Sequence, residues 1–477
     1  MSSPTPAYLM VALIVACFLA AGCTNSDNPG SVTLVPNQLP IPPKGAVVTT
    51  ADVIAYVDAA AEYAHEVGKE KAILEFNDPK STWNQGALYI FSEDVHGNAL
   101  AEPFEHEIVG TNIMYMVDSY GIPLVENLVD TGMKGRGLVS YNYPNPSRNY
   151  TIEPKVSYVV NIDPTYYIGA GTYENVGTTF PAAGMNDQPA ITREELVAFV
   201  KDAALYAQQN GKEKAAEAFQ NTSGPFMKED LYIIGYDYHE RNIVQPLSPW
   251  IKDLILTHYT DQDAVATIAQ LADIAQRGGG FAHTTQKIPV NGMWVFAPKL
   301  HYVMPVDEDW WISAGILNPD YPQIRSRNLT NVPVRSQKPE DLVAVVTRAV
   351  NYAREKGRDQ ALAEIGNPEG IFSRGEILLW AESADGVLLA DPVRWDRVGE
   401  NLLNATDPYG EKTTLVGIST LKNGTGFVHA MIPDRTGMSE KPIPALVYRK
   451  AVDDAWWISA SLPGIEVREG PAARALN

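Results

Sequence analysis

The sequence predicts an α+β protein of three tandem units, each a long N-terminal helix packed on a central antiparallel sheet. Three short motifs each occur three times in the 477 residues, at offsets of 143 or 144 and then 146 residues. The motifs are Tyr-Ala before a Gly-Lys-Glu-Lys-Ala run that is degraded in the third copy, Gly-x-Gly, and Tyr/Trp-Ile-Gly/Ser-Ala. They begin at Tyr63, Tyr206 and Tyr352, at Gly135, Gly278 and Gly424, and at Tyr167, Trp311 and Trp457. Because all three motifs keep one register, we interpret the repeats as homologous units.

The first unit opens with an amphipathic helix. Thr49 or Thr50 can cap its N-terminus, and apolar residues between Val53 and Ala64 recur at helical spacing. Gly68 is expected to end this helix as a left-handed C-cap. Residues 69–76 then predict a second, short helix.

Strands and turns follow the two helices. Leu88-Tyr89-Ile90-Phe91 is typical of a strand, and His96-Gly97-Asn98 of a hairpin turn. Residues 113–133 predict one helix, broken near Gly121-Ile122-Pro123. Three strands close the unit, at residues 137–143, 155–162 and 166–171.

The start of the chain predicts export. Residues 8–22 carry no charge, and they are too few to span a bilayer comfortably but enough for the core of a signal peptide. They run into Leu19-Ala20-Ala21-Gly22-Cys23, which resembles a lipoprotein signal, although Ala20 stands where a large apolar residue is usual. The resemblance implies that Cys23 carries a lipid. A plain signal peptide and an uncleaved anchor are the alternatives.

These observations divide the chain into segments. Pro/Gly-rich stretches at residues 174–189 and 318–339 carry few apolar residues and are expected to be exposed linkers. The expected segments are a signal peptide (1–22), a polar tether (23–47), the first unit (48–173), the second unit (190–318), the third unit (339–463) and a tail (464–477).

Composition excludes several classes of protein. The chain has 37 Lys+Arg and 57 Asp+Glu, a net charge of −20, which argues against binding to nucleic acid. Both cysteines, Cys17 and Cys23, precede the folded part, which therefore has no disulfide and no thiolate nucleophile. No catalytic, metal-binding or cofactor-binding motif occurs, so neither an enzyme nor a cofactor is expected. The acidic runs at 307–309 and 453–454 are expected to be solvated hairpin tips, with a calcium site as the alternative.

Longer motifs in the first unit carry a family resemblance. They are Phe76-Asn77-Asp78-Pro79, Leu88-Tyr89-Ile90-Phe91, Leu100-Ala101-Glu102-Pro103, Ile108-Val109-Gly110-Thr111-Asn112, the Gly135–Pro144 strand and Lys155-Val156-Ser157-Tyr158. Together they resemble the single Cache domain, an extracellular PAS-like sensor module, across about residues 48–173. The other two units resemble it at their ends only. The resemblance implies a long helix on an antiparallel sheet and the binding of small molecules outside the cell. Glu102 stands where the family usually has His.

Alternation along the closing strands predicts a ligand pocket. Val139, Tyr141 and Tyr143 fall on one face of their strand, and Lys155 and Ser157 share a face of the next. One lysine among tyrosine hydroxyls suits a small carboxylate, whereas core packing of the tyrosines and a solvated lysine are the alternatives. The candidate ligand-binding residues are Tyr89, Phe91, Tyr141, Tyr143, Lys155 and Ser157 in the first unit, His283, Lys299 and His301 in the second, and His429 in the third.

The third unit has Ala445 at the lysine position, where Arg449 or Arg397 would have to supply the cation. The first unit keeps the whole pattern, and we expect it to be the unit that binds.

The sequence therefore predicts an exported surface lipoprotein, anchored on the outer face of the cytoplasmic membrane, that binds a small organic acid or amino acid. The tail contains no transmembrane helix, kinase core or methyl-accepting coiled coil, so a signal would pass through a separate membrane receptor or transporter. Two other functions stay open. The second is a structural or adhesive surface protein whose repeats are spacers. The third is a hydrolase whose catalytic residues come together from distant positions in the chain.

Overall fold

The computed structural model describes residues 48–86, 88–145, 148–173, 191–228, 231–373, 377–433 and 441–469, with positions 40 and 42. The expected signal peptide, Cys23 and the first expected linker lie outside the described residues. Within the described residues, none of the helices has the length and apolar character needed to cross a membrane.

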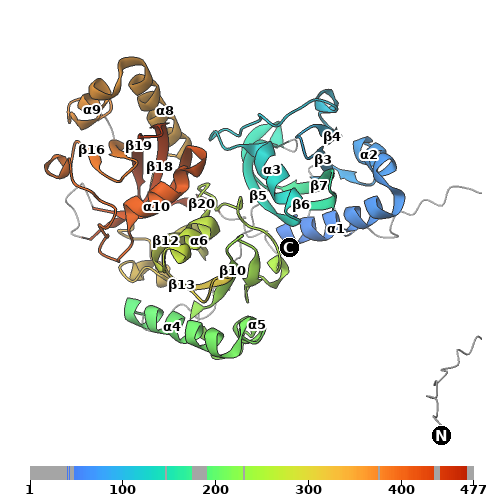
Figure 1. The fold of residues 1–477 in the computed structure, drawn as a ribbon, viewed down its shortest axis with the longest axis horizontal. Helices are drawn as coiled ribbons and strands as arrows, with labels where there is room; N and C mark the ends of the chain where they lie inside the picture. Colours follow the sequence, from blue (N-terminus) through green and yellow to red (C-terminus); the bar gives the residue numbers. More distant parts are fainter. Residues whose placement is uncertain are drawn as a thin grey trace, which may run out of the picture.

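Three antiparallel sheets with one common strand order form the framework (Figure 1). Their orders are β4-β3-β7-β6-β5, β11-β10-β14-β13-β12 and β16-β15-β19-β18-β17, and β20 pairs with β13 as a sixth strand of the second sheet. The strands are β3 (Phe91–Asp94), β4 (Ala99–Ala101), β5 (Arg136–Asn145), β6 (Thr151–Asp163), β7 (Tyr166–Thr172), β10 (Ile234–Asp237), β11 (Asn242–Val244), β12 (Gly280–Val290), β13 (Met293–Pro305), β14 (Trp310–Leu317), β15 (Leu378–Ser383), β16 (Leu388–Ala390), β17 (Thr425–Ile432), β18 (Ile443–Asp453), β19 (Trp456–Pro463) and β20 (Val467–Glu469).

Two helices precede each sheet, and a further helix lies in the chain between its two edge strands. The helices are α1 (Thr50–Val67), α2 (Lys69–Asn77), α3 (Leu124–Met133), α4 (Arg193–Asn210), α5 (Lys212–Gln220), α6 (Thr267–Gln276), α7 (Pro322–Arg325), α8 (Pro339–Lys356), α9 (Arg358–Gly366) and α10 (Thr413–Ser419). Two short hairpins add β1 (Asn84–Gln85) with β2 (Leu88–Tyr89) and β8 (Met227–Lys228) with β9 (Leu231–Tyr232).

The first helix begins and ends where the sequence predicts, but its C-cap differs. Thr49 caps α1, and its side chain accepts from the Asp52 amide while the Asp52 carboxylate accepts from the Thr49 amide. Gly68 has a φ of 84°, which favours glycine, but a ψ of 162°, so the backbone is not the left-handed C-cap expected. This extended ψ lets α2 begin at the next residue, and Gly211 and Gly357 repeat the conformation.

The expectation of one broken helix over residues 113–133 is correct for the second half of this segment and wrong for the first half. Only α3, from Leu124 onward, is helical. Before it, the Asp118 carboxylate accepts hydrogen bonds from the amides of Tyr120 and Ile122, which closes a five-residue turn in place of a helical turn. The same turn occurs at Asp261–Val265 and Asp407–Glu411, where the first aspartate again accepts from the amides two and four residues on.

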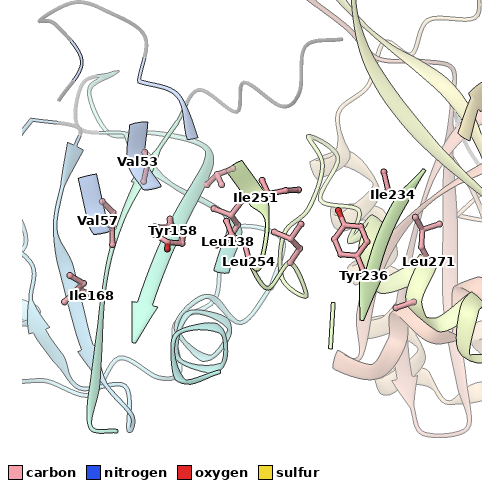
Figure 2. Packing of buried hydrophobic residues seen from close by; sticks show 14 of the residues in the cluster. Val53, Val57, Leu138, Tyr158, Ile168, Ile234, Tyr236, Ile251, Leu254 and Leu271 are labelled. Carbon is pink, nitrogen blue, oxygen red and sulfur yellow. The ribbon is translucent and has the colours of Figure 1, made fainter. Parts of the chain in front are cut away.

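The two faces of the first sheet bury different partners. Leu138, Tyr158 and Ile168 pack against Val53 and Val57 of α1 (Figure 2). The opposite face, which includes Tyr89, Phe91, Val139, Tyr141 and Val159, packs against α3 and the segment before it. The expected candidate residues thus lie on the face away from the long helix.

The first and second units are in direct contact. The amide of Leu138 on β5 donates to the Ile255 carbonyl at 3.0 Å, and Ser140 bonds Thr260 in the same segment. Leu138 lies beside Ile251 and Leu254 of the second unit in Figure 2, within one buried apolar cluster. The apolar core therefore continues from one unit to the next.

The stretch 318–339 differs from expectation, and the described part of the tail adds a strand to the second sheet. Tyr321 and Ile324 are buried in the core of the second unit, because the short helix α7 turns them inward. Residues 467–469 form β20, which is hydrogen-bonded to β13. The stretch 318–339 is therefore not the wholly exposed linker that the sequence predicts, and β20 lies between the units in Figure 1.

Candidate functional site

Lys155 is the centre of the first-unit pocket. It lies opposite Tyr141 in the β5–β6 register, so the two side chains share one face of the sheet, as the alternation predicts. The Lys155 ammonium donates to the Tyr89 hydroxyl at 3.1 Å. It lies 5.1 Å from the ring centroid of Tyr143 and 5.3 Å from that of Tyr173. A buried cation enclosed by aromatic rings is stabilised by their π faces.

Hydrogen bonds fix the tyrosines around this lysine. The hydroxyls of Tyr141 and Ser157 are 2.7 Å apart, and Tyr143 donates to a carboxylate oxygen of Glu105 at 3.3 Å. Phe91 completes the enclosure, with its ring centroid 5.8 Å from the Lys155 nitrogen. The structure therefore brings together all six first-unit candidates.

Two buried carboxyl groups also line this pocket, and the sequence-based hypothesis omitted both. Burial raises the pKa of Glu93 to about 7, opposed by the Tyr167 hydroxyl and the Lys155 charge. Burial also raises the pKa of Glu102, which Lys155 opposes. For Lys155, burial lowers the pKa, and the charges of Glu102, Glu105 and Glu93 oppose that shift. The lysine is therefore not the single cation among phenols that was expected, because acidic side chains face it.

The space left in the first-unit pocket is small. Its free volume is about 20 Å³, bounded by the tyrosines, the two acids and apolar residues of α3. That volume holds about one water molecule. The pocket is therefore filled by its own side chains.

The equivalent face of the second sheet lines a larger cleft. Lys299 on β13 occupies the Lys155 position, and its nitrogen lies 5.3 Å from the ring centroid of Tyr232, which stands where the first unit has Tyr89. This lysine lines a cleft of about 810 Å³. Leu138 and Pro154 of the first unit and Arg468 of β20 contribute other walls. Such a volume is within the range of small-molecule sites.

The residues around Lys299 differ in charge from those around Lys155. Tyr236 and Gln245 stand where the first unit has Glu93 and Glu102, and both line the cleft. The smaller Thr284 and Gln286 replace Tyr141 and Tyr143. Four basic residues, Arg148, Lys287, Lys299 and Arg468, line the cleft against two acidic ones, Asp261 and Glu469.

His301 lines the same cleft as a neutral side chain. Its Nδ1 lies 2.9 Å from the Ser313 hydroxyl. Burial, with the nearby charge of Lys299, lowers the pKa of His301 well below its usual range. The structure therefore places Lys299 and His301, both candidates from the sequence, at one cleft.

The third unit replaces the lysine with a different cation. Ala445 is buried at the lysine position, and Arg449 lies fully buried on the same strand. Glu382, at the position of Glu93, is one charge that acts on Arg449. Arg397 instead pairs with Glu400 at the surface, at 2.8 Å, so it does not serve this face.

His283 and His429 are not in a ligand cleft with Lys299, which corrects the sequence-based hypothesis. His283 Nε2 lies 2.5 Å from Asp407 of the third unit, and His429 Nε2 lies 2.5 Å from Asp261 of the second unit. Each histidine sits at the strand position of Ser140, one residue from the face that carries the lysine. They belong to the contact between the two units.

The sequence does not identify several residues that line the pocket and the cleft, and the structure shows why. Glu102 was noticed only as a departure from a family pattern, and Glu93 follows Phe91 at the spacing that places both on one face. Tyr173 lies at the end of β7, where no periodic signal marks it. The cleft walls from neighbouring units carry no signal in any one repeat.

Comparison with known proteins places the first unit. Residues 47–176 match the family model described as Single Cache domain 2. This confirms the resemblance for the first unit, and the match does not extend to the other two. No curated protein matches the chain.

Solved structures of sensor domains resemble parts of the chain. A methyl-accepting chemotaxis protein from Vibrio parahaemolyticus is 18% identical, with a TM-score of 0.24 over 26% of this chain and 86% of that one. A Cache chemosensory domain described for carboxylic acid recognition is 24% identical, with a TM-score of 0.20 over 25% and 80%. The ligand-binding domain of the Pseudomonas fluorescens chemoreceptor CtaA, in complex with L-isoleucine, is 9% identical, with a TM-score of 0.19 over 55% and 82%.

Proposed function

We propose that this chain is an exported sensory or binding protein for a small organic acid or amino acid, and that the ligand occupies the second-unit cleft at Lys299. The Cache match in the first unit supports a role in sensing small molecules outside the cell. The three sheets of one strand order support the interpretation of three tandem Cache-like units. A separate membrane receptor or transporter would receive the signal.

One observation carries the choice of the second unit. Lys155 and Lys299 occupy equivalent positions, but only Lys299, among these two, faces a volume large enough for an organic ligand. The acids that face Lys155 are replaced by Tyr236 and Gln245 around Lys299. A carboxylate in the cleft would meet a cation, the His301 imidazole and hydroxyl and amide groups, a set of partners that favours an anion.

Thermal unfolding of the purified chain with a panel of carboxylates and amino acids tests this proposal. A ligand at one hundred times its dissociation constant stabilises the folded state by about 2.7 kcal/mol. Lys299→Ala should weaken binding by at least about tenfold, because the carboxylate loses a charge-assisted hydrogen bond. Lys155→Ala is the matched control and should keep the ligand response.

Two outcomes would contradict the proposal. If no compound shifts the melting temperature, the alternative that the repeats are spacers gains. If Lys155→Ala loses the response and Lys299→Ala keeps it, the first-unit pocket binds the ligand.

Membrane attachment through Cys23 is part of the same proposal and rests on the sequence alone. Cys23→Ser should release the protein from membranes and leave its fold intact, since the described residues contain no cysteine. Membrane fractionation with a circular dichroism control measures both effects. Equal retention of the wild type and the variant would support a plain signal peptide or an uncleaved anchor instead.

A further inference from the structure

The boundary between the second and third units contains a buried cluster that the proposed ligand site does not use. Its members are His283 on β12 and Asp407 and Glu411, which begin and end the third unit's five-residue turn. We propose that these three side chains form a binding site for one divalent transition-metal ion that joins the two units.

The geometry of the three side chains suits a shared ion. One ligand atom from each residue lies within 4.8 Å of the other two. His283 Nε2 is 2.5 Å from Asp407 Oδ2 and 3.9 Å from Glu411 Oε2. An ion bound at about 2.0–2.2 Å to each atom holds its ligands roughly 3–4 Å apart, so the His283–Asp407 contact would open by a fraction of an ångström.

Glu411 has an oxygen that no described group satisfies. Its Oε1 accepts from the His283 backbone amide at 3.0 Å, across the boundary between the units. Its Oε2 is buried without a hydrogen-bond partner, and the residue is 1% exposed. A buried carboxylate oxygen is costly to leave unpaired, and a cation at this position would remove that cost.

The two sister turns show that Glu411 is a specific departure. The residue that ends the turn is Ile122 in the first unit and Val265 in the second, both apolar. The reciprocal pair across the same boundary, His429 with Asp261, therefore has Val265 where the first pair has Glu411. The nearby Asp263 is paired with Arg335. Of these two reciprocal pairs, only His283 with Asp407 has a second carboxylate, that of Glu411, directed at it in the described residues.

The donor set and the charge select the kind of ion. One imidazole nitrogen and two carboxylates favour zinc, manganese or iron over calcium and magnesium, which prefer six or more oxygen ligands. Two carboxylates give the site negative charge, and the nearby cation Arg449 is also attracted to Glu382. Two ionised carboxylates and a neutral imidazole together carry two negative charges, which match a divalent cation, because metal binding releases the protons of its ligands.

Metal titration of the full, chelator-treated chain tests this assignment. We expect one equivalent of Zn²⁺ or Mn²⁺ to bind by isothermal titration calorimetry and to raise the melting temperature. Glu411→Gln should lower the affinity by more than about 100-fold, because losing a residue that only supports a ligand already costs about 10- to 100-fold and here a charged ligand itself is lost, although the amide oxygen can still accept from the His283 amide. Asp261→Asn is the matched control at the reciprocal pair and should bind the ion like the wild type.

A second measurement does not depend on the variants folding. Co²⁺ added to the wild type should give the visible absorption of a nitrogen–oxygen site, and anomalous scattering should place the ion beside His283. Absence of stoichiometric binding, equal affinity of Glu411→Gln and the wild type, or an ion located elsewhere would each overturn the proposal.

Discussion

The first-unit pocket and the second-unit cleft present the same lysine on the same face of the same kind of sheet, yet they differ in what surrounds it. Around Lys155, tyrosine rings and the acids Glu93 and Glu102 leave a free volume of only about 20 Å³. Around Lys299, smaller side chains leave about 810 Å³. The backbone thus sets where the lysine lies, and the neighbouring side chains determine whether it faces a large free volume or buried acidic groups.

The comparison also shows how a buried cation is accommodated. A lysine removed from water needs a counter-charge, a hydrogen-bond partner or contact with solvent. Lys155 has acids and a tyrosine hydroxyl within the domain, whereas Lys299, which is 6% exposed, lines a cleft of about 810 Å³. We therefore interpret the first-unit lysine as structural and the second-unit lysine as the one that the proposed ligand would meet.

Replacing the two lysines should give the largest contrast in stability. Lys155→Ala leaves buried acids without their cation and creates a cavity, so we expect a loss of about 3 kcal/mol in the free energy of unfolding. Lys299 is 6% exposed but lines a cleft that water can enter, so Lys299→Ala should cost less, about 1 kcal/mol. Urea denaturation of both variants measures the difference. Equal losses would remove the distinction between the two sites.

The buried acids should make stability depend on pH in a defined direction. The pKa of Glu93 is raised from its usual value to about 7 in the folded state, so the folded chain holds this proton over a range where the unfolded chain releases it. Stability should therefore fall as the pH rises from about 5 to 7.

Glu93→Gln isolates this effect. The variant keeps the side-chain shape but not the titration, so its stability relative to the wild type should increase by about 2 kcal/mol between pH 5 and pH 7. Thermal or urea unfolding at each pH checks it. A stability difference that is constant or decreases with pH would show that Glu93 is ionised in the folded protein.

Introducing an acid into the second-unit cleft should produce the smallest effect. Gln245→Glu recreates beside Lys299 the acid that Glu102 provides beside Lys155, so the added negative charge would compete with a carboxylate ligand for the lysine. The affinity for a carboxylate ligand should fall by about tenfold, about 1.4 kcal/mol. Calorimetry with a ligand found for the wild type measures this, and Gln245→Asn is the uncharged control. An unchanged affinity would show that Gln245 does not influence the charge at the site.

Much of the fold follows from local sequence. Thr49 and Asp52 specify the start of α1, and alternation alone places Tyr141 and Lys155 on one face. The prediction of a helix over the first half of 113–133 was wrong because the Asp118 carboxylate accepts hydrogen bonds from amides that a helix would use. Hydrophobic periodicity does not reveal this preference.

The candidate site was less predictable because it depends on contacts between units. His283 looked like a ligand-binding residue within one repeat, but its partner is Asp407, more than a hundred residues away. The cleft likewise takes Leu138 from the first unit and Arg468 from β20. Such relations depend on how the units pack, which a pattern within a repeat does not encode.

The pairing of β20 with β13 has a consequence for how the chain matures. Because the chain is synthesised from its N-terminus, the first unit is complete before the second and third units are available. The second unit cannot acquire β20, or the cleft wall that Arg468 supplies, until the whole third unit has followed. If the proposed function holds, ligand binding would require the complete third unit, and a chain interrupted within that unit would leave the Met293–Val295 end of β13 without its pairing to β20.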